Sequence, residues 1–264
     1  MKQLVVLWIA GVMMLAAGCG QAGDKNVKLL TSPAEDIYKQ AQAMGSEGKL
    51  LEARALYQQI MVEHPDLKNI DQAEQELYAL NMKILFSSIP TPRTVVYEVV
   101  PGDTLGKICK QYNVTMDLVK ASNGMTTDMV RVGQKLRIWT GKISIGVNKS
   151  QNVLMLKSDN DILKVYHVST GINNSTPVGK FKIVTKLVDP VWYKAGAAIP
   201  PESPDNVLGS RWMGFDLQSY GIHGTVEPDK VGQQVTAGCV RMRNPDVEEL
   251  FKVVPMSTEV TIVD

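Results

Sequence analysis

Two short stretches near the end of the chain, GIHGT at residues 221–225 and TAGCVRMRN at residues 236–244, decide how the sequence is interpreted. They place His223 and Cys239 beside glycines. Cysteine attacks a carbonyl as the thiolate, and a neighbouring imidazole commonly removes the thiol proton at neutral pH. Adjacent glycines let backbone N–H groups turn toward a developing oxyanion. Singly, such residues are more often structural, but together they predict acyl transfer with Cys239 as nucleophile and His223 as base.

The same two stretches resemble the signature of the L,D-transpeptidase (YkuD-like) family, in which His-Gly-Thr/Ser is followed, after a spacer, by Ser/Thr-x-Gly-Cys and then Arg-Met. The resemblance extends over residues 142–264, because TPVGKFKI at 176–183 matches a turn of the family that leads into a strand, and NVLG at 206–209 stands where the family often has Asn-Pro-Leu-Gly. Alternating β-rich runs such as residues 163–168 point the same way. We therefore expect a multidomain α+β chain that ends in a mostly-β sandwich domain.

The resemblance implies a reaction on peptidoglycan stem peptides, which the family attacks between their third and fourth residues. Cys239 would form a thioester with the stem, and His223 would return the thiol proton to the departing D-alanine. Backbone groups would complete the site, with Gly238 beside the oxyanion and the carbonyl of Gly224 orienting the imidazole. The resemblance implies neither a cofactor nor a metal.

Three further residues are candidates for contacts with the stem peptide. Arg241 can bind a carboxylate in bidentate fashion. Thr236 begins the cysteine motif, and Trp192 lies in a segment, residues 184–204, that reads as a long irregular loop of the kind that walls a substrate groove. Ala237 stands where many relatives carry a second histidine, so we expect His223 to be the only base near the thiol.

Two alternatives to transpeptidation follow from the same residues. Water could resolve the acyl-enzyme in place of an amine, which would make the protein an L,D-carboxypeptidase or another hydrolase of the stem. The chain could also be a catalytically silent wall-binding lipoprotein, although the intact His223 and Cys239 argue against that. No residue distinguishes water from an amine as acceptor.

A compact unit precedes the catalytic region, at residues 94–139. A strand near residues 95–99, a helix capped by Asp103 or Thr104, a second helix ending at Asn123-Gly124 and a closing strand over residues 130–138 give the order β-α-α-β. The sequence YEVVPGDTLGKICKQYNV resembles a LysM domain. That resemblance implies binding of glycan chains that contain N-acetylglucosamine, such as those of peptidoglycan.

Residues 33–88 show the periodicity of helices, with a corner at Gly45 to Gly48 and a third helix over residues 71–86. The small alanines Ala41 and Ala53 are typical of a single tetratricopeptide repeat, but a simple helical hairpin fits equally well, because such repeats usually need several copies for stability. The segment Ile89-Pro90-Thr91-Pro92 predicts a stiff linker to the next unit.

The first residues predict export. Residues 1–18 have a basic start, an apolar run and small residues before Cys19, the pattern of a signal peptide. The ending LAAGC resembles a bacterial lipobox, which implies lipidation of Cys19, a tether over residues 19–32 and a membrane-anchored protein of the bacterial cell envelope, on the periplasmic or extracytoplasmic side. An ordinary signal peptide, with Cys19 incidental, is the alternative.

Composition limits the partners. Lys and Arg number 28 against 27 Asp and Glu, so the chain has no electrostatic footprint for nucleic acid. The three cysteines have separate explanations, since Cys109 lies in an apolar helical context, and no disulfide is expected. His64 and His167 read as structural. The partners expected are peptidoglycan, through its stems and its glycan, and a membrane through the lipid.

Overall fold

The computed structural model describes residues 32–194 and 196–264. The expected signal peptide and Cys19, and all but the last residue of the expected tether, lie outside the described residues. Within the part of the chain that is described, no helix is long and apolar enough to cross a membrane.

Three helices form the N-terminal segment, α1 Pro33–Ser46, α2 Leu50–Glu63 and α3 Ile70–Leu85. The hydroxyl of Ser32 caps α1 by accepting a hydrogen bond from the Glu35 N–H. Ala41 and Ala53 are fully buried where α1 meets α2, because small side chains allow the two helices to approach closely. The helical N-terminal region predicted from the sequence is confirmed.

The β-α-α-β unit follows in the predicted order, as β1 Thr94–Glu98, α4 Leu105–Tyr112, α5 Met116–Ser122 and β2 Lys135–Trp139. β1 and β2 pair antiparallel, and Thr104 and Thr115 cap the two helices. Cys109 is buried. The closing strand is shorter than predicted, because residues 130–134 form a loop with Gly133 at φ +80° and the ladder begins only at Lys135.

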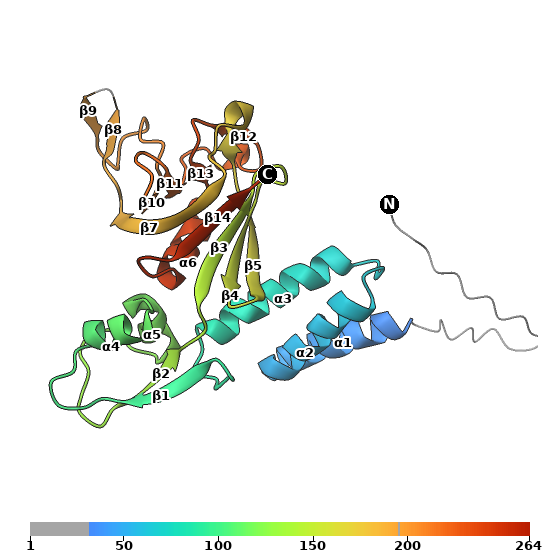
Figure 1. The fold of residues 1–264 in the computed structure, drawn as a ribbon. Helices are drawn as coiled ribbons and strands as arrows, with labels where there is room; N and C mark the ends of the chain where they lie inside the picture. Colours follow the sequence, from blue (N-terminus) through green and yellow to red (C-terminus); the bar gives the residue numbers. More distant parts are fainter. Residues whose placement is uncertain (1–31, 195) are drawn as a thin grey trace, which may run out of the picture.

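The C-terminal domain is built on one eight-stranded sheet of order β13-β11-β10-β7-β14-β3-β4-β5. Its strands are β3 Ile143–Asn148, β4 Val153–Ser158, β5 Asp161–His167, β7 Gly179–Val188, β10 Arg211–Phe215, β11 Gly221–His223, β13 Val240–Arg241 and β14 Glu259–Val263. β7 pairs with β14 in its first half and with β10 in its second. It is strongly curved in Figure 1, so the sheet folds over on itself there. The predicted α+β class and the mostly-β last domain are confirmed.

Shorter elements complete the domain. They are β6 Thr170–Gly171, paired with β12 Gln234–Thr236, the hairpin of β8 Trp192–Lys194 and β9 Ala197–Ile199, the turns η1 Ile172–Asn174 and η2 Pro228–Lys230, and α6 Asn244–Val253. The irregular loop expected over residues 184–204 is wrong in part, because β7 continues to Val188 and the β8–β9 hairpin follows. Most side chains of β7 are exposed or half-buried on both faces of the strand. Its sequence therefore lacks the alternation of apolar and polar residues that marks a half-buried strand.

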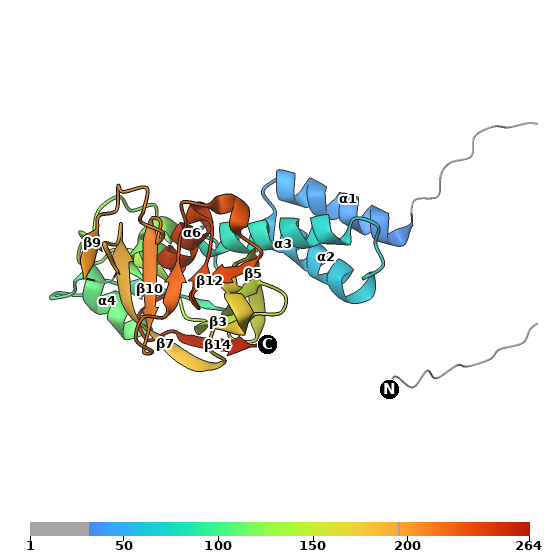
Figure 2. The same ribbon diagram turned by 90° about the horizontal axis from the view of Figure 1, so that it is seen from above.

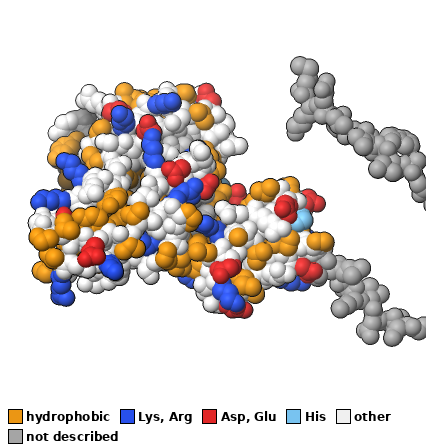
Figure 3. Space-filling view, turned by 60° about the horizontal axis from the view of Figure 1, so that its bottom comes forward, with side chains coloured by type: hydrophobic (Ala, Val, Ile, Leu, Met, Phe, Trp, Pro, Cys, Tyr) orange, Lys and Arg blue, Asp and Glu red, His pale blue; other side chains and the backbone are white. Residues whose placement is uncertain are grey.

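The side chains that fill the interior form two clusters. One lies among α1, α2 and α3, and the other is continuous from the end of α3 through the β-α-α-β unit into the sheet and α6. On the surface, Lys and Arg side chains are interspersed with Asp and Glu over the face seen in Figure 3. Viewed from above, in Figure 2, the helical segment projects from one end of the molecule.

Candidate active site

Neighbouring strands bring the two motifs together. His223 ends β11, and Cys239 directly precedes β13. These strands are parallel neighbours, with Ile222 beside Val240 and His223 beside Arg241. The cysteine and the histidine predicted from the sequence therefore lie on adjacent strands at the same part of the sheet.

The orientation of the imidazole is fixed by the backbone. His223 is 4% exposed, and its Nδ1 lies 2.7 Å from the carbonyl oxygen of Gly224. A carbonyl can only accept a hydrogen bond, so Nδ1 carries the proton and Nε2 is the basic nitrogen. The orienting role expected for Gly224 thus has a direct geometric counterpart.

Burial decides the charge of the imidazole. Removal from water, assisted by the charge of Arg241, lowers the pKa of His223 to about 4, against the opposing effect of the Gly224 carbonyl. Burial also raises the pKa of the Cys239 thiol above its ordinary value, although the same arginine acts in the opposite direction. At neutral pH the resting pair is therefore a thiol and a neutral imidazole, and a preformed thiolate is not needed to explain the site.

An indole lies flat against the imidazole. The rings of Trp212 and His223 are stacked with centroids 5.9 Å apart and planes inclined by 24°. The Trp212 indole lies against the paired glycines Gly214 and Gly221, since a Cβ on Gly214 would approach it to 2.8 Å and one on Gly221 to 2.9 Å. Trp212 was not predicted from the sequence, and its only signal there was a large aromatic residue two positions before Gly214.

The loop before the cysteine is braced by Thr236. Its hydroxyl accepts a hydrogen bond from the Gly238 N–H at 3.1 Å and donates one to the Cys239 carbonyl at 2.7 Å. Gly238 has φ +134°, and a Cβ there would lie 2.6 Å from the Tyr220 ring, so only glycine fits. The N–H of Gly238 is engaged by Thr236, which leaves the N–H of Cys239 as the backbone donor for an oxyanion. Thr236 is 4% exposed and its hydroxyl is engaged within the loop, and its contact with a substrate stays a prediction.

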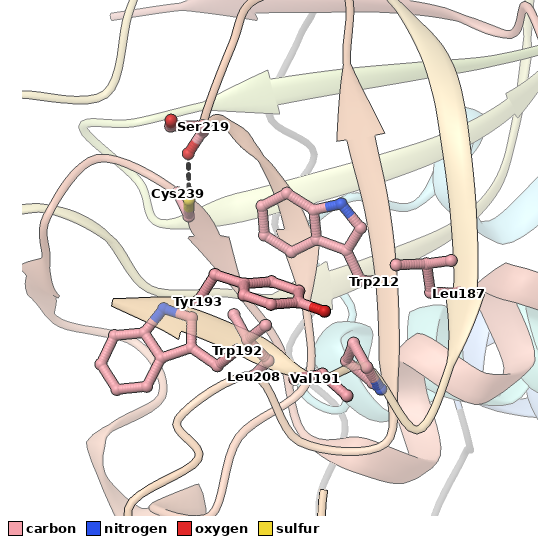
Figure 4. Close-up of a pocket in the computed structure, with 9 residues that line it drawn as sticks. Leu187, Val191, Trp192, Tyr193, Leu208, Trp212, Ser219 and Cys239 are labelled. Carbon is pink, nitrogen blue, oxygen red and sulfur yellow. Dashed lines mark hydrogen bonds between the residues drawn. The ribbon is translucent and has the colours of Figure 1, made fainter. Parts of the chain in front are cut away.

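The thiol stands at the edge of an apolar cavity of about 350 Å³. Its Sγ donates a hydrogen bond to the carbonyl oxygen of Ser219 at 3.4 Å. Figure 4 shows the rings of Trp192, Tyr193 and Trp212 around this hollow, with Cys239 at one side. Among the residues that the structure describes, no charged side chain lines the cavity, whose residues are Leu187, Pro190, Val191, Trp192, Tyr193, Leu208, Trp212, Ser219 and Cys239. The structure thus places Trp192 at the cavity, as the sequence suggested.

Arg241 is placed differently. Its guanidinium is 8% exposed, pairs with Glu227 at 3.2 Å and lies outside the residues that line the cavity. Among the described residues, its buried Nε has no hydrogen-bond partner. In this structure its effects are electrostatic, because its positive charge lowers the pKa values of both His223 and Cys239.

Comparison with known proteins identifies the two units. Residues 142–262 match the model of the L,D-transpeptidase catalytic domain, and residues 97–139 match that of the LysM domain. Putative L,D-transpeptidase YkuD of Bacillus subtilis (strain 168) is 31% identical over 175 residues, 64% of this chain and 98% of that protein. This chain belongs to the L,D-transpeptidase family. Putative L,D-transpeptidase YqjB of the same organism is 43% identical over 124 residues, which are 45% of this L,D-transpeptidase and 69% of the relative.

Solved structures similar to this L,D-transpeptidase include L,D-transpeptidase 3 from Mycobacterium tuberculosis in complex with a faropenem-derived adduct. That structure is 17% identical, has a TM-score of 0.41, and the match covers 50% of this chain and 66% of the other. The family and the LysM domain expected from the sequence motifs are confirmed by the family models and the curated relatives.

Proposed function

We propose that this L,D-transpeptidase transfers the acyl group of a peptidoglycan stem peptide through a thioester on Cys239. The observation that carries the proposal is the His223 imidazole, held neutral by burial and oriented by the Gly224 carbonyl on the strand beside the cysteine. A neutral imidazole with an unprotonated Nε2 is the form that can accept a proton from a thiol.

The proton and the leaving group balance over two half-reactions. The Cys239 sulfur attacks the carbonyl carbon of the scissile peptide bond while His223 takes the thiol proton. The C–N bond then breaks, and the imidazolium gives that proton to the departing amine. In the second half, His223 takes a proton from an acceptor amine as the amine attacks the thioester carbonyl. The C–S bond then breaks, and the imidazolium returns the proton to the departing sulfur.

In this scheme the Cys239 N–H stabilises the oxyanion, because the N–H of Gly238 already donates to the Thr236 hydroxyl. The aromatic cavity next to the sulfur would receive part of the stem near the scissile bond.

The LysM domain supplies a second contact with peptidoglycan. Between α5 and β2, a hollow of about 700 Å³ is lined by loop residues within 124–134, most of them polar or small. We infer that this loop region takes the N-acetylated sugars of the glycan chain. Linking a weak glycan contact to the catalytic domain raises the local concentration of stems.

Membrane anchoring through lipidated Cys19 is the remaining part of the proposal, and it rests on the lipobox-like sequence alone. It places the enzyme in the bacterial cell envelope, tied to a membrane by residues 19–32. Cys19→Ala is expected to release the protein from the membrane fraction. Retention of this variant in the pellet after a high-salt wash would contradict lipidation.

Mass analysis of muropeptides incubated with the purified enzyme tests the reaction. We expect dimers joined by 3→3 cross-links, formed by the native chain and absent with Cys239→Ala. Tripeptides without dimers would identify an L,D-carboxypeptidase. Unchanged muropeptides, with both proteins folded, would leave only wall binding and would overturn the proposed function.

A further inference from the structure

The LysM domain and the catalytic domain are joined with almost no slack. β2 ends at Trp139 and β3 begins at Ile143. Between them, a Cβ on Gly141 would collide with the hydroxyl of Ser158 and come within 2.9 Å of the Trp139 indole nitrogen. Gly141 is therefore packed closely at the junction, while Thr140 and Lys142 on either side of it are exposed, and the connection is too short to act as a flexible linker.

Polar contacts join the two domains where the β4–β5 turn meets the LysM domain. Arg93, just before β1, pairs with Asp159 at 2.9 Å and with Asp161 at 2.7 Å, and both carboxylates belong to the β4–β5 turn of the catalytic domain. The Trp139 indole N–H donates to the Ser158 hydroxyl at 3.2 Å, with both residues buried. Asp159 also accepts from the Lys142 N–H at 3.0 Å. The start and the end of the LysM domain are thus bound to the same turn.

Two further contacts fix its orientation. On the far side, α5 packs against α6, and the Thr115 hydroxyl donates to the carbonyl of Lys252. Behind it, Arg137 of β2 is 6% exposed, and its guanidinium donates to the carbonyls of Leu85 at 3.1 Å and Ile89 at 2.8 Å, at and just beyond the end of α3, which itself packs on β5 of the catalytic domain. Contacts at three separate places, around a shared apolar core, leave no axis about which the domain can swing.

The catalytic cavity and the LysM domain lie apart on the same side of the molecule. In Figure 1, the β8–β9 hairpin at the catalytic cavity is at the top of the view and the LysM domain is at the bottom, both away from α1 and α2. A glycan held by the LysM loops and a stem held at Cys239 would therefore be separated by a distance that the junction sets.

We propose that the LysM domain is a fixed arm, so that the enzyme selects stems that lie at a set offset along the glycan chain bound by that domain. This inference rests on the proposed function and narrows its substrate to a polymer of N-acetylated sugars that carries peptide stems. A rigid arm presents only those stems that match its geometry, whereas a flexible arm would present many stems at a lower effective concentration.

Rigidity is tested apart from catalysis. Spin labels on Val132→Cys and Ile172→Cys, both at exposed positions in the two domains, are placed in a chain with Cys19 and Cys239 replaced by Ala. We expect one narrow distance distribution in this chain. The same labels should give a broad distribution when Gly-Gly-Ser-Gly-Gly-Ser is inserted between Thr140 and Gly141 together with Arg93→Ala. A broad distribution before any insertion would overturn the proposal.

Selection is tested with the insertion in the catalytically intact chain. Substrates are glycan chains carrying tetrapeptide stems and a soluble tetrapeptide of the same composition. We expect the ratio of their kcat/KM values to fall about tenfold or more with the insertion, and the modified positions on a chain of defined length to scatter. Turnover of the soluble stem and sedimentation with glycan should stay as in the native chain.

The matched control carries the same insertion between Glu47 and Gly48. Both residues lie in an exposed turn, where a Cβ on Gly48 would have no atom within 4 Å. It should behave as the native chain. An unchanged polymer-to-soluble ratio and position pattern in the junction variant would overturn the fixed arm. If the insertion impairs soluble turnover, the spin-label distances of the chain without the insertion decide the question, and a broad distribution there would overturn the fixed arm. Absence of soluble turnover in the native chain would instead count against the proposed function.

Discussion

Trp212 and His223 face each other ring to ring, 5.9 Å apart at their centroids, on neighbouring strands β10 and β11. The indole covers one face of the imidazole and at the same time forms part of the cavity beside Cys239. One side chain therefore both limits the rotation of the proposed base and separates it from water on that face.

Replacement of Trp212 is expected to change the base as well as the rate. Trp212→Leu should lower kcat on a soluble stem about tenfold, because the imidazole loses a face that positions it. Water would then reach His223 and raise its pKa toward the ordinary value, so the acid limb of the pH–rate profile should move to higher pH. Trp212→Phe keeps an aromatic face and should stay near the native profile. Equal profiles for all three proteins would contradict this role.

The native enzyme should keep its activity in mildly acidic solution. His223 accepts a proton only when neutral, and its pKa is lowered to about 4 by burial. As pH rises, kcat/KM should therefore increase through about 4 and then stay level through neutrality, whereas an exposed histidine would give its limb near about 6.5. A pH–rate profile on a soluble stem measures the limb. A midpoint above pH 6 would show that the imidazole is not held in this buried, neutral form.

Removal of the base is expected to silence the thiol. His223→Gln should lower acylation about a hundredfold or more, because no other group in the motif can take the proton of Cys239. Ala237, two residues before Cys239, has no group that could substitute for the imidazole. The rate at which iodoacetamide alkylates Cys239 near pH 7, followed by mass spectrometry, measures the effect. A thermal melt of the variant checks that it is folded. Cys239 alkylated at the native rate in the folded variant would exclude the proposed couple.

Arg137 gives a prediction about stability. Its guanidinium donates to three carbonyls at and beyond the end of α3, those of Ile84, Leu85 and Ile89. Arg137→Met would leave these buried acceptors without donors and should lower the free energy of unfolding by about 3 kcal/mol. Arg137→Lys restores one charged donor and should recover part of the loss. Chemical denaturation of the full chain measures both, and a Met variant as stable as the native protein would show that water satisfies these carbonyls.

Local patterns predicted much of this molecule. The cap at Thr104, one of the two residues predicted, the buried Cys109 and the order of the β-α-α-β unit follow from short-range rules of periodicity and capping. The resemblance of the two motifs also named the family. These features depend on residues close in sequence, which is why they could be recognised there.

Features that depend on pairing between distant strands were not predictable in this way. The stacking of Trp212 on His223 requires the register of β10 and β11, and the hydrogen bonds of Thr236 require the backbone conformation of its loop. Similarly, the sequence suggests that Arg241 binds a carboxylate of the substrate, whereas in the structure its guanidinium pairs with the carboxylate of Glu227. A side chain suited to a ligand is equally suited to a partner within the protein, and only the tertiary structure decides between them.

The helical segment has a consequence for how the protein can be divided. β5 is the last strand of the sheet, and α3 packs along it, with the buried Asn81 donating to the Leu163 carbonyl at 3.1 Å. A chain begun at residue 142, where the family resemblance begins, would leave that strand with bare backbone groups able to pair with another molecule. The start of the family resemblance is thus a poor place to cut the chain. We expect a fragment that begins at residue 142 to aggregate, and a fragment that also keeps residues 70–85 to stay monomeric.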